Sequence, residues 1–164
     1  PQERGIDVLA IDVCQPAINV MAERGVRQVL RIDVLDLTGG DFDTGLLLMH
    51  GIGLVQDLRG LDRFLRQAKR LIGLGGQVLV DSFDIRSIQD PIHAAYRETN
   101  RRQGRYGGEV RMRFSYRGTA GPAFGWLNVD PETFCDYASR RGWSFQIVDR
   151  APDGDYLAML APVA

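Results

Sequence analysis

The sequence has few of the residues that form disulfide frameworks, zinc sites or membrane spans. Its 164 residues include two cysteines, Cys14 and Cys135, which lie far apart with no Cys-x-x-Cys motif and no histidine cluster near them. This spacing favours neither a disulfide framework nor a zinc site, so we expect both thiols to be reduced. No apolar run approaches the roughly 18 residues that span a bilayer, and the first five residues do not resemble a signal peptide. We therefore expect a cytoplasmic protein with no metal and no membrane partner.

Neither sign of charge is in excess. The chain has 20 Lys and Arg against 21 Asp and Glu, for a formal net charge of -1. This balance argues against a protein that coats nucleic acid or a membrane, although it leaves room for a local basic patch. A chain of this length buries roughly 68–70% of its unfolded surface, so it can hold a core without disulfides or metals. We expect one domain over residues 1–164.

Several nucleotide-binding and catalytic motifs are absent. Gly51-Ile52-Gly53 follows an expected strand, but the third glycine of G-x-G-x-x-G would fall at Gln56. The glycines from Gly73 to Gly76 come after a helix and before a strand, where they are typical of a helix terminator. The chain also has no G-x-x-x-x-G-K-[ST] and no G-x-S-x-G. These absences argue against P-loop ATPases, kinases, α/β-hydrolases and metallohydrolases.

The first half of the chain alternates short apolar runs with amphipathic stretches. Such near-continuous apolar strands, alternating with helices, predict a parallel sheet that is covered on both faces. Glycines and prolines mark the boundaries of these elements. Strands are expected at 7–11, 26–32, 44–49 and 77–81, with helices at 16–24 and 58–71.

The second half has a different pattern. Strict alternation of apolar and polar residues over 109–117, the polar ones mostly arginines, predicts a half-exposed antiparallel strand, with 118–121 as the turn and 124–129 as its partner. A polar helix is expected at 91–102, and a helix from Pro131 to Arg141 capped by Asp130. The chain closes with a hairpin of strands 143–148 and 156–160. The predicted fold class is α/β, a Rossmann-like, mostly parallel sheet with helices on both faces, an antiparallel terminal hairpin and an inserted helix plus β-hairpin.

Polar residues end all four expected parallel strands, where open α/β sheets bind their ligands. They are Asp12, Asp33, His50 and, after the fourth strand, Asp81 with Ser82. Asp12 could accept hydrogen bonds from ribose hydroxyls, or it could cap the helix that follows. Asp33 could accept a purine amino hydrogen, or it could hold its own loop together. His50 could be a general base or a polar contact in a cleft, or a hydrogen-bonded structural residue.

The order of these segments resembles that of the class I S-adenosylmethionine-dependent methyltransferases. The run VLAIDVCQPAI from Val8 resembles the second strand of that family, and RIDVLDL from Arg31 resembles the third. The segment 42–53 is similar to the fourth-strand motif, and 71–81 is similar to the fifth strand with its preceding loop. The closing helix and hairpin match the sixth and seventh strands. The resemblance runs from about residue 5 to the end of the chain.

The resemblance implies S-adenosylmethionine as cofactor and gives the strand-end residues specific roles. Asp12 would bind the ribose hydroxyls, and Asp33 would contact the adenine amino group. Val13 and Val34 would pack on the adenine. His50 and Gly51 would also contact the cofactor, with His50 as the candidate catalytic base and Ile52 facing the acceptor.

One feature of the family has no counterpart here. Its first strand and E/D-x-G-x-G-x-G type motif precede the segment that resembles the second strand, and only residues 1–6 precede that segment in this sequence. We therefore expect an N-terminally truncated methyltransferase domain in which two strands lack their usual neighbour. The missing strand would come from other residues or another copy of the chain, or the sheet would close differently.

The function that follows is methyl transfer to a small-molecule acceptor in the full-length form. Residues 86–129 are expected to form an inserted, lid-like segment in which Arg113, Tyr116 and Trp126 contact the acceptor. The alternative for this segment is a purely structural hairpin with its arginines in water. The segment after the fourth strand lacks N-P-P-[YF], and the near-neutral charge also argues against a nucleic-acid partner.

Two other functions remain open from the sequence. An acidic strand tip also suits the ribose of NAD, which would make the protein a nicotinamide-dependent oxidoreductase. A truncated domain could instead be a non-catalytic binding module. The acceptor, its nucleophilic atom and a homodimeric state are not determined by the sequence.

Overall fold

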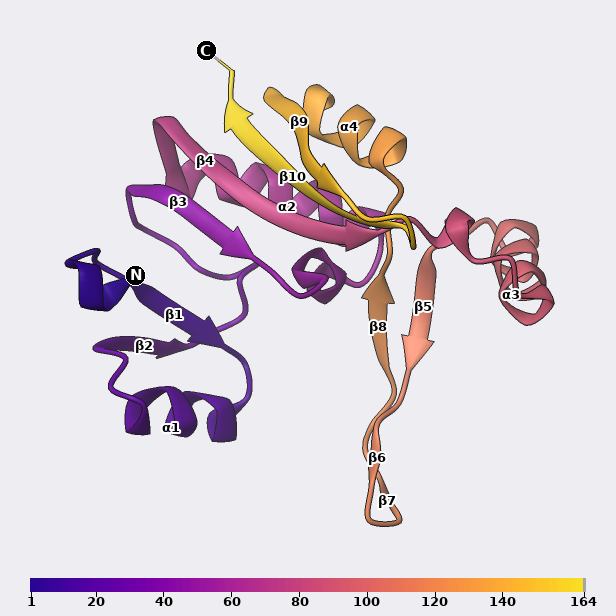
Figure 1. The fold of residues 1–164 in the computed structure, drawn as a ribbon, viewed down its shortest axis with the longest axis horizontal. Helices are drawn as coiled ribbons and strands as arrows, with labels where there is room; N and C mark the ends of the chain where they lie inside the picture. The colour runs from indigo at the N-terminus through magenta and orange to yellow at the C-terminus, as the bar shows by residue number, and fades with distance from the viewer. Residues whose placement is uncertain (164) are drawn as a thin grey trace. The chain divides into compact units, whose positions relative to one another are not determined.

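The computed structural model describes residues 1–163, which form two compact units, the first from Pro1 to Thr38 and the second from Gly39 onward. The first unit contains a short strand, a helix and a second strand (Figure 1). Strands β1 (Leu9–Asp12) and β2 (Gln28–Arg31) are parallel and are connected by α1 (Gln15–Glu23). Helix α1 has a proline in its first turn, and Gly25 follows it with a positive φ of 80°. This β-α-β unit is the one that the sequence predicts.

The second unit is built on a four-stranded sheet in the order β3-β4-β10-β9. Strands β3 (Phe42–Leu47) and β4 (Ile72–Phe83) are parallel. The other two strands, β9 (Trp143–Arg150) and β10 (Asp155–Pro162), form the predicted hairpin, and β10 is antiparallel to both of its neighbours. The predicted α/β class, with a mixed and partly parallel sheet, is therefore confirmed. Within the described residues, β1 pairs only with β2, and β3 pairs only with β4.

Helices α2 (Leu58–Leu71) and α4 (Pro131–Arg140) lie behind this sheet in Figure 1. Apolar residues at helical spacing bury one face of α2, and its bounds are those that the sequence predicts. The Asp57 carboxylate caps α2 by accepting a hydrogen bond from the Gly60 amide at 2.7 Å. The buried side chains that join these helices to the sheet include Leu61, Phe64, Leu65, Val78, Val80, Phe134 and Trp143.

The glycines after α2 do not form a terminating loop, contrary to the sequence prediction. The helix ends at Leu71, and Gly73, Gly75 and Gly76 lie inside β4. A Cβ on Gly76 would lie 2.9 Å from the carbonyl oxygen of Asp43. The glycine therefore permits close approach of β3 and β4, which is a second common use of the residue.

A helix and a long hairpin are inserted between β4 and α4. Helix α3 (Pro91–Arg102) has the predicted bounds, and the hairpin extends away from the main sheet (Figure 1). Its base pairs β5 (Glu109–Met112) with β8 (Phe124–Leu127), and its tip pairs β6 (Ser115–Tyr116) with β7 (Thr119–Ala120). The continuous strand predicted at 109–117 is thus interrupted before Ser115.

The turn of this hairpin also differs from the prediction. Tyr116 pairs with Thr119, so the loop has two residues, Arg117 and Gly118, with φ angles of 48° and 79°. Two successive positive φ angles are typical of the hairpin turn that matches the twist of its strands. Thr119 and Ala120 belong to β7, so the turn predicted at 118–121 is wrong.

The architecture of the two units tests neither of two predictions about organisation. These are the single domain over residues 1–164 and the role of residues 86–129 as a lid. No helix in the described residues is long and apolar enough to cross a lipid bilayer.

Candidate functional site

In the first unit, two carboxylates follow neighbouring parallel strands. Asp12 ends β1 opposite Arg31 of β2, and Ile32 donates its amide hydrogen to the Asp12 carbonyl at 3.1 Å. Asp33 comes next in the chain. Because parallel strands end at one edge of their sheet, the sequence correctly predicts both acids at the same edge.

Both carboxylates also have a local role. The Oδ1 atom of Asp12 accepts the Cys14 amide hydrogen at 2.7 Å, and Oδ1 of Asp33 accepts that of Leu35 at 2.8 Å. The Asp33 bond is the loop contact that the sequence left as an alternative. The Asp12 bond closes the turn before α1 and does not cap that helix, whose N-cap residue is Cys14 with no side-chain cap hydrogen bond. A carboxylate has about four acceptor positions, so one local bond leaves capacity for a ligand.

The residues after these acids are apolar. Val13 is 59% exposed, and Val34 is half-buried. Carboxylates beside accessible apolar side chains suit a ligand that combines hydroxyl or amino donors with a planar ring, as in a nucleoside. The donor chemistry of this edge therefore fits the ribose and adenine of S-adenosylmethionine.

In the second unit, the chain makes a strained turn at the carboxyl end of β3. Met49 and His50 have positive φ angles of 64° and 57°, which residues with a Cβ rarely adopt. The Asp81 carboxylate accepts hydrogen bonds from the Met49 amide at 3.0 Å and the Gly51 amide at 3.1 Å. Strain that is held by neighbouring groups is common at functional sites.

His50 forms a side-chain hydrogen bond at this turn. Its Nε2 lies 2.9 Å from Oδ1 of Asp155 at the start of β10, and both side chains are more than 40% exposed. The Phe83 ring lies beside the imidazole, with 6.1 Å between centroids. His50 is thus hydrogen-bonded, as its structural alternative predicts, and remains partly accessible.

The sequence reasoning missed two acids at this turn. Asp81 was visible as a polar residue at a strand end, but no pattern indicated that its carboxylate would bind the amides after β3. Asp155 is 105 residues from His50, and only the antiparallel pairing of β4 with β10 brings it there. Within the part of the chain that the structure describes, no three His, Cys, Asp or Glu side chains form a metal site.

The residues after His50 form a short 3-10 helix, Gly51–Val55. Ile52 is fully buried in it, with no exposed surface. The Ile52 side chain thus fills the core in this structure, and the contact with an acceptor that the sequence predicts stays a prediction. Gly51 is also buried, and its amide is held by Asp81.

The inserted hairpin contacts this helix through its base. A Cβ on Gly53 would lie 2.0 Å from the Trp126 indole, so the indole packs directly on the backbone of the 3-10 helix. The Phe124 ring meets Trp126 edge-on at 6.4 Å between centroids and lies 5.3 Å from the Phe114 ring. The structure thus places Trp126 beside the strand-end residues of the second unit.

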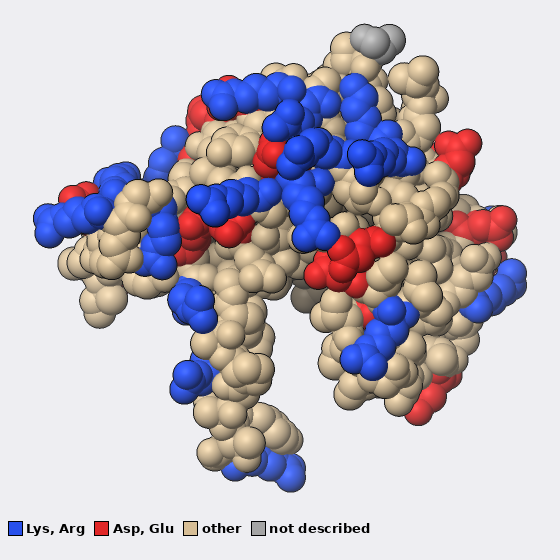
Figure 2. Space-filling model, turned by 180° about the vertical axis from the view of Figure 1, so that it is seen from behind, with Lys and Arg blue, Asp and Glu red and all other residues tan. Residues whose placement is uncertain are grey.

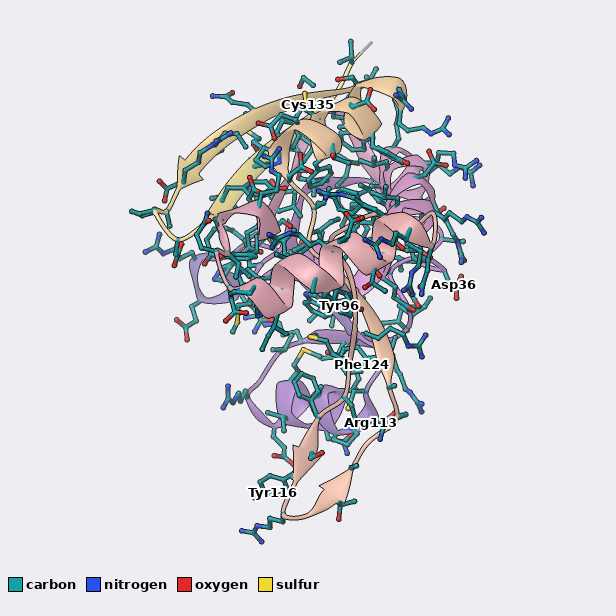
Figure 3. The ribbon with its side chains drawn as sticks, turned by 90° about the vertical axis from the view of Figure 1, so that its right-hand side faces the viewer. Asp36, Tyr96, Arg113, Tyr116, Phe124 and Cys135 are labelled. Atoms are coloured by element: carbon teal, nitrogen blue, oxygen red, sulfur yellow. The ribbon has the colours of Figure 1, made fainter. Side chains whose placement is uncertain are left out.

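The other two predicted acceptor contacts lie farther out. Arg113 and Tyr116 are exposed along the hairpin and toward its tip, as Figure 3 shows. Tyr116 is 73% exposed, and the Arg117 guanidinium lies 5.2 Å from the centre of its ring. The hairpin therefore does not bring Tyr116 and Trp126 together.

A second polar cluster follows the carboxyl end of β4. The Tyr106 hydroxyl donates to Oδ2 of Asp130, and Arg86 forms ion pairs with Asp84 at 2.6 Å and Glu132 at 2.5 Å. Burial by itself would raise the pKa of Asp130, but hydrogen bonds from Tyr106 and Thr133 outweigh it, and this pKa lies below its ordinary value. Burial and the neighbouring Asp130 raise the pKa of the Tyr106 phenol.

A small cavity of about 180 Å³ adjoins this cluster. Its walls come from the segment after β4, from α3 and from the loop before β5. The lining residues are Ile85, Arg86, Arg97, Arg101, Arg105, Tyr106, Gly107, Gly108 and Asp130. The sequence identified Asp130 as a helix cap, which is confirmed by its hydrogen bond from the Thr133 amide at 2.9 Å, but gave no sign of the cavity.

Comparisons with known proteins give similarity in structure only. No family model matches the sequence, and no curated protein matches it. A S-adenosylmethionine-dependent methyltransferase from Bacteroides fragilis, crystallised with S-adenosyl-L-homocysteine, is 30% identical with a TM-score of 0.82. The match covers 99% of this chain and 66% of that one, so the chain spans slightly less than two thirds of its relative.

More distant structures agree in fold. The CcbJ methyltransferase from Streptomyces caelestis is 10% identical with a TM-score of 0.72, over 99% of this chain and 77% of that one. The glycopeptide N-methyltransferase MtfA, complexed with S-adenosyl-L-homocysteine, is 12% identical with a TM-score of 0.66, over 98% of this chain and 76% of that one. The resemblance that the sequence indicates is therefore confirmed for the fold.

Proposed function

We propose that this chain, which has the class I S-adenosylmethionine-dependent methyltransferase fold, binds S-adenosylmethionine and serves methyl transfer to a small-molecule acceptor. The observation that carries the proposal is the pair of carboxylates, Asp12 and Asp33, at one edge of a parallel strand pair in a chain of this fold. The structural relative from B. fragilis was crystallised with the demethylated cofactor.

The first unit would hold the nucleoside part of the cofactor. Asp12 would accept hydrogen bonds from the ribose hydroxyls, and Asp33 would accept one from the adenine amino group. Val13 and Val34 would pack on the adenine ring. When bound, S-adenosylmethionine supplies a methyl group on an already activated sulfonium, so the protein mainly has to align the acceptor and remove a proton.

The turn after β3 would serve both cofactor and acceptor. The resemblance implies that His50 and Gly51 contact the cofactor, and the turn that carries them is held in place by the two amide bonds to Asp81. Hydrogen bonding to the Asp155 carboxylate favours the tautomer of His50 that carries its proton on Nε2. That tautomer leaves Nδ1 free to accept a proton from the acceptor nucleophile, which is the role of a general base.

The inserted segment 86–129 would select the acceptor. Trp126 packs on the 3-10 helix next to His50 and offers a planar apolar surface. Arg113 and Tyr116 lie farther along the same hairpin, where they would reach an anionic or planar acceptor if the hairpin closes over the strand ends. Ile52 would act indirectly, by supporting the turn from the core.

Methyl transfer by variants of the hairpin tests the acceptor role. Arg113→Ala and Trp126→Ala should each reduce kcat/KM for the acceptor by about 10-fold or more, while the affinity for S-adenosylhomocysteine changes less than about threefold. The rate is measured with labelled S-adenosylmethionine across a panel of small amines, hydroxyls and carboxylates. Arg111→Ala, an exposed arginine on β5, is the matched control. Equal losses of acceptor use and cofactor affinity would reduce the hairpin to a structural element.

A further inference from the structure

We propose a second ligand site, independent of methyl transfer, in a surface cleft between α2 and α4 that binds the oligophosphate group of a small molecule. The cleft has a volume of about 410 Å³, within the range of small-molecule sites. We call it the arginine cleft. Its lining residues are Leu58, Arg59, Asp62, Arg66, Tyr137, Arg140 and Arg141.

The arginine cleft is strongly basic in a chain that is not. Four arginines and one aspartate line it, and Asp136 pairs with one of these arginines, which leaves a surplus of two positive charges, whereas the whole chain has a net charge of -1. Figure 2 shows Lys and Arg side chains gathered on this face of the molecule. Such a local concentration of one sign attracts an anion of comparable charge.

Two arginines in the cleft share one carboxylate. Arg66 Nη2 lies 2.9 Å from Oδ2 of Asp62, and Arg141 Nε lies 2.5 Å from Oδ1 of the same side chain. Each guanidinium has five N–H donors, and these contacts use one nitrogen atom of each. Asp62 therefore orients two guanidinium groups beside each other and leaves them further donors.

The other two arginines complete the cleft. Arg140 pairs with Asp136 at 2.6 Å, and its guanidinium lies 5.9 Å from the centre of the Tyr137 ring. Arg59 has no carboxylate partner within the described residues and is exposed. Exposed ion pairs of this kind contribute little to stability, so their arginines can exchange a carboxylate for a phosphate at low cost.

The shape and charge favour a compact phosphate chain over an extended polyanion. The guanidinium fork matches phosphate oxygens in bidentate geometry. A positive surplus within one concave cleft suits a compact, multiply charged triphosphate, whereas nucleic acid needs a basic stripe that follows its backbone. The Tyr137 ring gives the same cleft a surface for a planar group next to the phosphates.

Substitution of Asp62 provides a test in which the affinity for an anion should rise, whereas substitution of the arginines should lower it. The hydrogen bond from Arg141 lowers the pKa of Asp62, so this carboxylate is ionised at neutral pH and repels a bound anion. Asp62→Asn keeps the shape of the side chain and removes that charge. A site for an anion should therefore gain affinity from this substitution, which a purely structural ion pair would not predict.

Calorimetric titration of the protein with inorganic triphosphate and, separately, with a nucleoside triphosphate tests the proposal. We expect both to bind, the double variant Arg59→Ala/Arg140→Ala to bind roughly 10- to 100-fold more weakly, and Asp62→Asn to bind several-fold more tightly. Arg70→Ala, an exposed arginine of α2 outside the cleft, should bind like the wild type. Tighter binding of the nucleoside form would assign a role to the Tyr137 ring, and equal binding would assign recognition to the phosphates alone.

Three results would overturn the proposal. They are the absence of binding to either triphosphate, an equal loss in the cleft variant and the Arg70 control, and binding of duplex DNA or RNA without binding of triphosphates. The affinity of the same variants for S-adenosylhomocysteine should stay at the wild-type value, which separates this site from the proposed cofactor site.

Discussion

His50 combines a strained backbone with an accessible, hydrogen-bonded imidazole. Its φ of 57° is costly for a residue with a Cβ, and the two amides held by Asp81 maintain it. The hydrogen bond with Asp155 fixes the ring at the end of β3. A structural histidine needs only the hydrogen bond, whereas a general base also needs a second nitrogen that can take a proton.

Substitutions of His50 and Asp155 separate these two roles. His50→Gln should lower kcat of methyl transfer by about 100-fold or more, because glutamine cannot accept the proton. Asp155→Asn should cause a smaller loss, since it disturbs the tautomer and keeps the imidazole. The affinity for S-adenosylhomocysteine, measured by calorimetry, should fall much less than kcat in both variants. A loss of cofactor affinity as large as the loss of rate would assign His50 to binding alone.

Gly53 lies at a position where no side chain fits, because the Trp126 indole packs against its backbone. Any Cβ there would overlap the Trp126 indole. Gly53→Ala should therefore reduce the free energy of unfolding by about 1–3 kcal/mol, as measured with urea. Gly107→Ala is the matched control, because a Cβ at that position meets its neighbours at 3.6 Å or more. Trp126→Leu should restore part of the stability that Gly53→Ala removes, and no restoration would contradict the close packing.

Helix α4 begins at a cap that also joins the inserted segment to the sheet. Asp130 accepts hydrogen bonds from the Thr133 amide and the Tyr106 hydroxyl, and its carboxylate lies 3.6 Å from the Arg86 guanidinium. These contacts hold the folded-state pKa of Asp130 below its unfolded value. A depressed carboxyl pKa contributes stability that is present above the unfolded pKa of about 3.9 and is lost as the pH falls through the folded value.

Unfolding at two pH values tests this cap. Asp130→Ala should lower the free energy of unfolding at pH 7 by at least about 1–2 kcal/mol. The difference from the wild type should shrink at pH values below about 4, where the carboxylate becomes protonated. Asp136→Ala, which removes an exposed ion pair on the same helix, should change stability by less than about 1 kcal/mol at either pH. A pH-independent difference for Asp130→Ala would contradict the role of its charge.

The sequence predicted those helices and strands that are specified by residues within them or directly next to them. The bounds at 58–71 follow from apolar residues at helical spacing, and Pro91 marks the start of the polar helix at 91–102. The caps Asp57 and Asp90 come from the structure and were not part of the sequence prediction. The interruption of the hairpin strand before Ser115 and the strand role of Gly76 could not be predicted this way. Both depend on what lies across the sheet or hairpin, which no local pattern encodes.

The same distinction applies to the candidate site. Asp12, Asp33 and His50 were identifiable because each ends a predicted strand. The pairing of His50 with Asp155 was not, because it requires the register between β4 and β10. The burial of Ile52 was missed for a similar reason, since the 3-10 helix that turns it into the core leaves no periodic signal in five residues.

The order of the secondary structure elements along the whole chain is what supports the proposed activity. The two units preserve the strand order that the sequence resemblance implies, with β1 beside β2 in one and β3-β4-β10-β9 in the other. Their match to a methyltransferase at 30% identity and a TM-score of 0.82 supports cofactor binding as the central claim. An acidic strand tip also suits NAD, so the cofactor must be tested directly.

Calorimetric titration of the protein with S-adenosylhomocysteine and with NAD, repeated on Asp12→Asn, is the most direct test of this claim. The asparagine carbonyl oxygen can still accept the Cys14 amide hydrogen, so the substitution removes the charge with little change to the turn. We predict that S-adenosylhomocysteine binds, that NAD does not, and that Asp12→Asn weakens binding about 10-fold or more, whereas the exposed control Asp7→Asn does not. Binding of NAD in place of S-adenosylhomocysteine, or equal affinities of the Asp12 and Asp7 variants, would contradict the account.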